Sequence, residues 1–113
     1  MRVSLGLLKE YITLTEQGVS RLAARNWSVN EKGQLTKRFA LKSHSDIGLM
    51  SYEITKVADK LRHHPEMNIK YRFVTIFLRT NDVQQITKTD EELADLIDGI
   101  YQEMNHSEKK RDK

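Results

Sequence analysis

The feature that most restricts the fold is a helical pattern of apolar residues that starts near Ser45 and is closed by the only proline, Pro65. The apolar positions recur every three or four residues, as on one face of an α-helix; they are Ile47, Met50, Ile54, Val57, Ala58 and Leu61. The helix must end before Pro65, because proline disfavours helical geometry in the preceding residue. A helix with one apolar face needs a second layer, such as a sheet, to bury that face.

Two β-hairpins are predicted on either side of this helix. Before it, residues 27–29 and 35–41 bracket the turn-prone run Asn30-Glu31-Lys32-Gly33. After it, apolar residues alternate with polar ones in two successive phases; they are Met67, Ile69, Tyr71 and Phe73, then Val74, Ile76 and Leu78. The change of phase near Tyr71-Arg72 predicts the second hairpin.

Two further helices are predicted from capping patterns. Thr13-x-x-Glu16 forms a capping box for a first helix that runs to about Arg25, although Gly18 lies inside it. Thr87-x-x-Asp90 opens the last helix in the same way. That helix carries on one face the apolar residues Leu93, Leu96, Ile97, Ile100 and Met104.

The order of elements is therefore α-β-β-α-β-β-α. It predicts an α+β fold, a four-stranded antiparallel sheet with helices packed on one face. A length of 113 residues allows one hydrophobic core. We expect an N-terminal extension at residues 1–12, a single domain at 13–104, and a polar basic tail at 105–113 that is disordered.

Charge and cysteine content exclude several classes of protein. The net charge is only +3, with 19 Lys and Arg interleaved with 16 Asp and Glu, so we do not expect nucleic-acid binding. The one basic cluster, Lys109-Lys110-Arg111, lies in the tail. There is no cysteine, which excludes a disulfide framework, a thiol nucleophile and a Cys-ligated metal.

The sequence also gives an expectation for location. No apolar run approaches the ~20 residues that a membrane span needs, and the stretch Val3–Leu8 is too short for a secretory signal. Arg2 and Lys9 would suit a mitochondrial presequence, but Glu10 and Glu16 weaken that reading. We expect a cytoplasmic protein without membrane contact.

The chemistry is concentrated in the pair His63-His64, at the junction of the second helix and the third strand. Histidine exchanges protons near neutral pH because its reference pKa is about 6.5. Two adjacent imidazoles on a turn can contact one small ligand from two directions. On spacing alone, a pair of exposed helix-end residues that favour the negative end of the helix dipole is the better interpretation.

The surrounding residues change that interpretation, because they resemble the pterin-4a-carbinolamine dehydratases. That family has an acidic residue and a lysine before a His-His-Pro-Glu/Asp run, as in 59–66, Asp-Lys-Leu-Arg-His-His-Pro-Glu. A hairpin follows that ends in Thr-His, and then a Leu-Ser/Thr-x-x-Asp element, which 86–90 matches as Ile-Thr-Lys-Thr-Asp. The likeness includes Trp27 and extends over residues 14–104.

The resemblance implies dehydration of a 4a-hydroxytetrahydropterin (4a-carbinolamine) to quinonoid dihydropterin plus water, as part of tetrahydrobiopterin recycling. The pterin is the substrate and no cofactor is expected. Carried over from the family, His63 is the general acid/base and His64 contacts the substrate. The other residues expected to bind the pterin are Asp59, Pro65, Glu66, Thr80 and Asn81.

Two positions depart from the family pattern. Asn81 stands where the family has its third histidine, and Arg62 stands where the residue before the pair is often acidic. Asparagine forms hydrogen bonds but does not exchange protons at neutral pH. The second proton-transfer role is therefore vacant, and Asp82 or a bound water is the candidate to fill it. The loss of one acid/base partner would leave slow but measurable catalysis, because such a group is typically worth about 10²–10⁴-fold.

A metal site is not expected, because structural zinc needs four ligands and the remaining histidines, His44 and His106, are remote in sequence. Asp90 is interpreted as a helix N-terminal residue rather than a catalytic acid. Trp27 and Tyr71 are interpreted as packing residues.

The resemblance also implies partners. Members of the family form homodimers or homotetramers, and an animal member is a dimerisation cofactor for a homeodomain transcription factor. The alternative function is therefore a catalytically weak or inactive family member that acts as a protein-binding dimerisation cofactor or scaffold. Retention of His63 and His64 favours a working site, and Asn81 favours the alternative.

Overall fold

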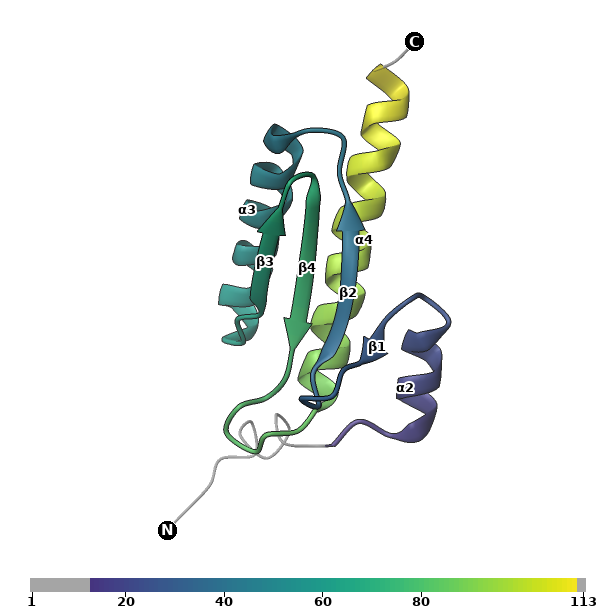
Figure 1. The fold of residues 1–113 in the computed structure, drawn as a ribbon, viewed down its shortest axis with the longest axis vertical. Coiled ribbons are helices and arrows are strands. Elements are labelled where there is room, and N and C mark those ends of the chain that lie inside the picture. Colours follow the sequence, from purple (N-terminus) through teal and green to yellow (C-terminus); the bar gives the residue numbers. More distant parts are fainter. Residues whose placement is uncertain (1–12, 112–113) are drawn as a thin grey trace.

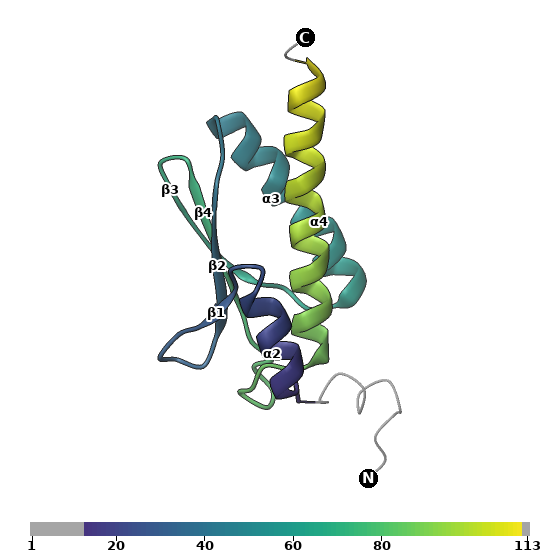
Figure 2. The same ribbon diagram turned by 90° about the vertical axis from the view of Figure 1, so that its right-hand side faces the viewer.

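The computed structural model describes residues 13–111 and has the predicted α+β architecture. The elements follow in the order α2 (Glu16–Ala23), β1 (Ser28–Val29), β2 (Leu35–Ala40), α3 (His44–Leu61), β3 (Glu66–Lys70), β4 (Phe73–Leu78) and α4 (Lys88–Arg111). The strands form one sheet in the order β1-β2-β4-β3, and every pairing is antiparallel (Figure 1). The three helices of the described residues lie on the same face of the sheet (Figure 2).

The core forms between that face and the helices. On the central strand β4, Val74, Ile76 and Leu78 are buried and alternate with half-buried residues on the other face. Because β2 pairs with β4 in a register that sets Leu35 opposite Leu78 and Phe39 opposite Val74, the buried sets of both strands share one face. Both predicted hairpins are confirmed.

The long helix α3 is also confirmed, with a start one residue before the predicted Ser45. Its N-cap is Ser43, whose Oγ accepts a hydrogen bond from the backbone N–H of Asp46. The buried residues Ile47, Met50, Ile54 and Ala58 follow the predicted spacing. The helix ends at Arg62, which adopts the left-handed conformation with φ 53° and turns the chain toward β3.

The first helix differs from its prediction. Its N-cap is Thr15, whose side chain accepts from the N–H of Gly18, and not Thr13. Thr13 instead forms a β-bridge with Thr87, and the N–H of Leu14 donates to the carbonyl of Ile86. The capping box failed as a predictor here because residues 13 and 14 bind the loop before α4. The predicted extension at residues 1–12 lies outside the described residues.

The last helix opens at the predicted capping box, but it is longer than predicted. It continues through residues 105–111, which we expected to be a disordered tail. Leu93 and Ile97 are buried as the pattern indicated, and so is Ala94, which the pattern did not include. Leu96 is 40% exposed and does not belong to the buried face. No helix in the described part of the chain is long and apolar enough to span a membrane.

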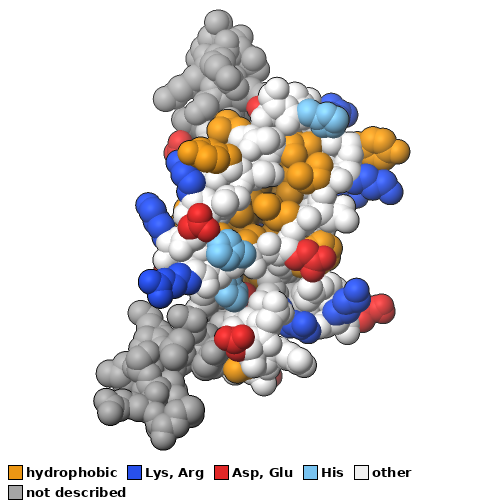
Figure 3. All heavy atoms as spheres, turned by 90° about the vertical axis from the view of Figure 1, so that its left-hand side faces the viewer, with side chains coloured by type: hydrophobic (Ala, Val, Ile, Leu, Met, Phe, Trp, Pro, Cys, Tyr) orange, Lys and Arg blue, Asp and Glu red, His pale blue; other side chains and the backbone are white. Residues whose placement is uncertain are grey.

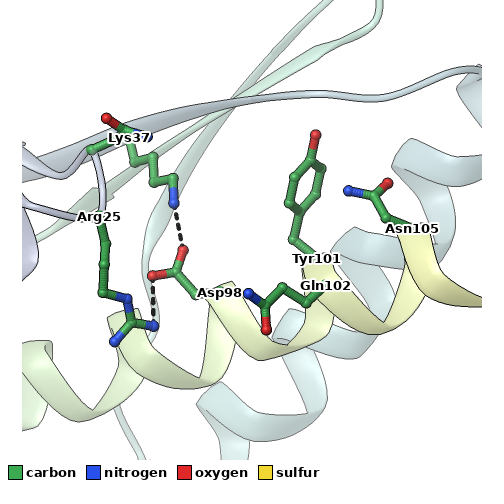
Figure 4. Close-up of a pocket in the computed structure, with 7 residues that line it drawn as sticks. Arg25, Lys37, Asp98, Tyr101, Gln102 and Asn105 are labelled. Atoms are coloured by element: carbon green, nitrogen blue, oxygen red, sulfur yellow. Dashed lines mark hydrogen bonds and ion pairs between the residues drawn. The ribbon is translucent and has the colours of Figure 1, made fainter.

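A cluster of charged and polar side chains fastens the α2–β1 segment to α4. The carboxylate of the buried Asp98 accepts a hydrogen bond from Trp27 Nε1 (3.0 Å). It also accepts one from Lys37 Nζ (2.7 Å) and forms an ion pair with Arg25 (3.0 Å) (Figure 4). Nearer the surface, the guanidinium of Arg21 donates hydrogen bonds to Asp95 and to Glu91. These bonds, the one to Asp95 most of all, raise the pKa of Arg21 above its ordinary value.

Candidate active site

The histidine pair lies where α3 ends and the chain turns into β3. The left-handed Arg62 reverses the chain, and the backbone N–H of His63 donates back to the carbonyl of Ala58 (3.0 Å). Two residues later Pro65 leads directly into β3. On the side of the molecule where α3 and β3 lie, histidine and carboxylate side chains border an area of apolar side chains (Figure 3).

His63 forms the inner of two histidine–aspartate pairs. Its Nε2 lies 2.5 Å from Oδ1 of Asp90, near the start of α4. The Asp90 side chain is fully buried, and that of His63 is 14% exposed. The aspartate is thus shielded from water, whereas the histidine is partly accessible. Such an arrangement can fix the position of an imidazole and still allow it to exchange protons with a ligand.

The second oxygen of Asp90 holds the aspartate itself in place. Oδ2 accepts from the backbone N–H of Thr87 (2.8 Å) and from the hydroxyl of Thr80 (2.9 Å). The two threonine hydroxyls also lie 2.7 Å apart. The buried carboxylate of Asp90 therefore caps α4, holds Thr80 in the segment after β4, and contacts His63.

This role of Asp90 was missed by sequence reasoning, which assigned it only to helix capping. The capping role is confirmed by the Thr87 hydrogen bond. The pairing with His63 could not be found from spacing, because 27 residues separate the two and only the packing of α3 beside α4 brings them together.

His64 forms the outer pair, with Asp59 one turn back on α3. Its Nε2 lies 2.6 Å from Asp59 Oδ1, and the side chains are 63% and 66% exposed. Water competes with such an exposed pair, so it is held less firmly than the inner one. The two adjacent histidines thus have the same kind of partner in opposite environments.

The other predicted site residues are distributed around these pairs. Thr80 is buried and joined to Asp90, as described. Glu66 begins β3, is exposed and accepts from Gln34 Nε2 at 3.3 Å. Asn81 and Asp82 are exposed on the loop after Thr80, which a bridge between Thr80 and Gln85 closes.

Among the side chains that the structure describes, no group of three or more from His, Cys, Asp or Glu is placed to hold a metal ion. A pocket of about 300 Å³ lies on the side of α4 that faces α2 and β1; it is lined by Arg25, Asn26, Lys37, Asp98, Tyr101, Gln102 and Asn105 (Figure 4). None of the residues of the two histidine–aspartate pairs lines this pocket. The hydrogen bonds of Asp98 in it serve to attach the α2–β1 segment to α4.

Comparison with known proteins matches the chain to one family. The family model described as Pterin 4 alpha carbinolamine dehydratase matches residues 12–100. A protein of Herpetosiphon aurantiacus named for this dehydratase is 37% identical over 75 residues, which are 66% of this chain and 77% of that protein. One from Saccharolobus islandicus is 32% identical over 89 residues, covering 78% of this chain and 90% of the relative.

Solved structures give the same result for the fold. The crystal structure of a transcriptional coactivator/pterin dehydratase from Brucella melitensis superposes with a TM-score of 0.69 at 27% identity, covering 79% of this chain and 98% of that one. A pterin dehydratase-like protein identified as a RuBisCO assembly factor in the alpha-carboxysome has a TM-score of 0.57 at 21% identity, covering 66% and 88%. The second likeness is one of fold.

Proposed function

Because the chain belongs to the pterin-4a-carbinolamine dehydratase family, we propose that it dehydrates a 4a-hydroxytetrahydropterin to quinonoid dihydropterin. The observation that carries this proposal is the buried Asp90 carboxylate hydrogen-bonded to the partly exposed His63. A helix-end histidine with no special role would not need a buried aspartate from another helix.

The reaction requires two proton movements and no electron transfer, because substrate and product differ only by water. The leaving 4a-hydroxyl takes a proton, the bond between C4a and oxygen breaks, and the nitrogen N5 loses its proton as the double bond to C4a forms. His63 in its protonated form supplies the first proton. Such general acid catalysis is typically worth about 10²–10⁴-fold.

The other predicted site residues bind the substrate or accept the second proton. His64, exposed beside Asp59, binds the substrate and changes affinity more than rate. Pro65, Glu66, Thr80 and Asn81 complete the binding region. Pro65 and Glu66 follow the histidines along the chain, and Asn81 follows Thr80, whose hydroxyl donates to Asp90. Asp82 is the first candidate to accept the proton from N5, since Asn81 does not exchange protons at neutral pH.

A non-catalytic role is the second candidate. The flank formed by α3 and β3 has apolar side chains that are about half exposed or more, which we call the α3–β3 surface; they are Leu49, Tyr52, Ile69 and Tyr71. In the described part of the chain, the edge strand β3 of this surface pairs with β4 and with no second strand. Exposed apolar patches and open strand edges are typical of association surfaces. We propose that this surface forms a homodimer or homotetramer, in the cytoplasm, and a protein-binding scaffold would use it too.

One experiment separates the two functions. Purified protein is added to freshly formed 4a-hydroxytetrahydropterin, and the appearance of quinonoid dihydropterin is followed against the uncatalysed reaction. A rate that rises in proportion to protein concentration supports the dehydratase. A rate equal to the uncatalysed one, with pterin binding still detected by calorimetry, supports the scaffold.

A further inference from the structure

The two oxygens of Asp90 have different kinds of partner. On the Oδ2 side, the backbone N–H of Thr87 can only donate, so this oxygen must be an acceptor. On the Oδ1 side lies Nε2 of His63 at 2.5 Å. An ionised carboxylate only accepts hydrogen bonds, so the proton in this contact belongs to Nε2.

We infer that Asp90 fixes the neutral imidazole of His63 in the Nε2–H tautomer, so that proton exchange with the pterin takes place at Nδ1. This inference rests on the proposed function for the identity of the substrate. Asp90 is then a positioning residue, since it acts through His63. The partner that one ring nitrogen keeps decides which tautomer the other presents.

The consequence for the chemical step is specific. When His63 is protonated, both nitrogens carry hydrogen, and Nε2 keeps its hydrogen bond to Asp90. The proton that leaves is the one on Nδ1, and it goes to the 4a-hydroxyl as the C4a–oxygen bond breaks and water departs. The proton on N5 goes to a second base or to water. His63 is left neutral as the Nε2–H tautomer and regains its Nδ1 proton from solvent.

The substitution Asp90→Asn tests this directly because it keeps the shape and reverses the hydrogen bond. The asparagine carbonyl must face the N–H of Thr87 and the hydroxyl of Thr80, since the backbone N–H cannot accept. Its NH₂ group then faces Nε2 of His63, which must become an acceptor. Neutral His63 would therefore shift to the Nδ1–H tautomer and lose the ability to accept a proton at Nδ1.

A matched control comes from the same buried cluster. Thr87→Val removes the hydroxyl that contacts Thr80 at 2.7 Å but leaves the backbone N–H and both oxygens of Asp90 in place. It disturbs the packing around the helix cap without touching His63. A purely structural role for Asp90 would make the two variants behave alike.

The readout is the ¹⁵N chemical shift of each ring nitrogen of His63 in histidine-labelled protein, at a pH where the ring is neutral, together with kcat and KM. We expect Nε2–H in the wild type and in Thr87→Val, and Nδ1–H in Asp90→Asn. We also expect kcat of Asp90→Asn to fall by roughly 10²–10⁴-fold with little change in KM.

Two results would overturn the inference. One is an Nδ1–H tautomer in the wild-type protein, and the other is an Asp90→Asn variant with the inverted tautomer and wild-type kcat. Failure of the proposed function looks different. A wild-type protein that is inactive but shows Nε2–H, inverted by Asp90→Asn, would remove the dehydratase while supporting Asp90 as the residue that sets the tautomer.

Discussion

At the scale of single residues, the adjacent histidines differ in what surrounds their aspartates. Asp90 is fully buried, whereas Asp59 is 66% exposed. We predict that His64→Ala raises KM more than it lowers kcat, because an exposed contact contributes to binding in the ground state and the transition state alike. Steady-state kinetics of the dehydration would measure this. A fall in kcat with unchanged KM would instead make His64 a proton-transfer group.

We predict that Asn81 also affects the rate. If the second proton transfer limits turnover, Asn81→His should raise kcat by about one or two powers of ten, within the range of acid/base catalysis. The comparison variant is Asp82→Asn, which should lower kcat if Asp82 accepts the N5 proton. A wild-type rate in both variants would mean that neither position takes part in proton transfer.

At the scale of elements, the helices and hairpins follow from local pattern. The spacing of Ile47, Met50 and Ile54 and the break before Pro65 were sufficient for α3, because an amphipathic helix records its buried face in the sequence. The residues at which helices begin were harder to predict. Thr13 matched a capping box but pairs with Thr87, a partner 74 residues away that no local pattern reveals.

The same limit applies to the candidate site. His63 and His64 were found because they are adjacent and lie in a specific run of residues. The Asp90 partner of His63 was assigned only to its local role, the cap of α4, because its second hydrogen bond depends on how α3 and α4 pack.

The attachment of α2 and β1 to α4 gives a prediction at this scale. Asp98→Ala would leave the buried Trp27 N–H and the Lys37 ammonium without their acceptor, and removal of one partner of a buried ion pair typically costs about 3–5 kcal/mol. We expect a comparable loss in the free energy of unfolding, measured with denaturant, and unchanged kcat per folded molecule.

The control is Asp95→Ala, on the same helix, where the carboxylate forms exposed ion pairs with Arg21 and Arg25. Such pairs are typically worth about 1 kcal/mol or less. Equal losses of stability in the two variants would contradict the role assigned to Asp98.

At the scale of the whole molecule, a four-stranded sheet leaves two edges to be covered or blunted. We predict an oligomer in solution at micromolar concentration, formed through the α3–β3 surface. Ile69→Lys on the edge strand β3 should shift the mass measured by light scattering toward the monomer. Val29→Lys, on the opposite edge strand β1, is the matched control and should leave the mass unchanged. A monomeric wild-type protein would contradict the prediction.

The most direct test of the central claim is the kcat of His63→Ala at saturating 4a-hydroxytetrahydropterin, compared with the wild type and with His44→Ala. His44 is a histidine at the far end of α3, bonded to the carbonyl of Tyr71. The account predicts that His63→Ala lowers kcat by roughly 10²–10⁴-fold and that His44→Ala has the wild-type value. A His63→Ala variant that dehydrates the substrate at the wild-type rate would contradict it.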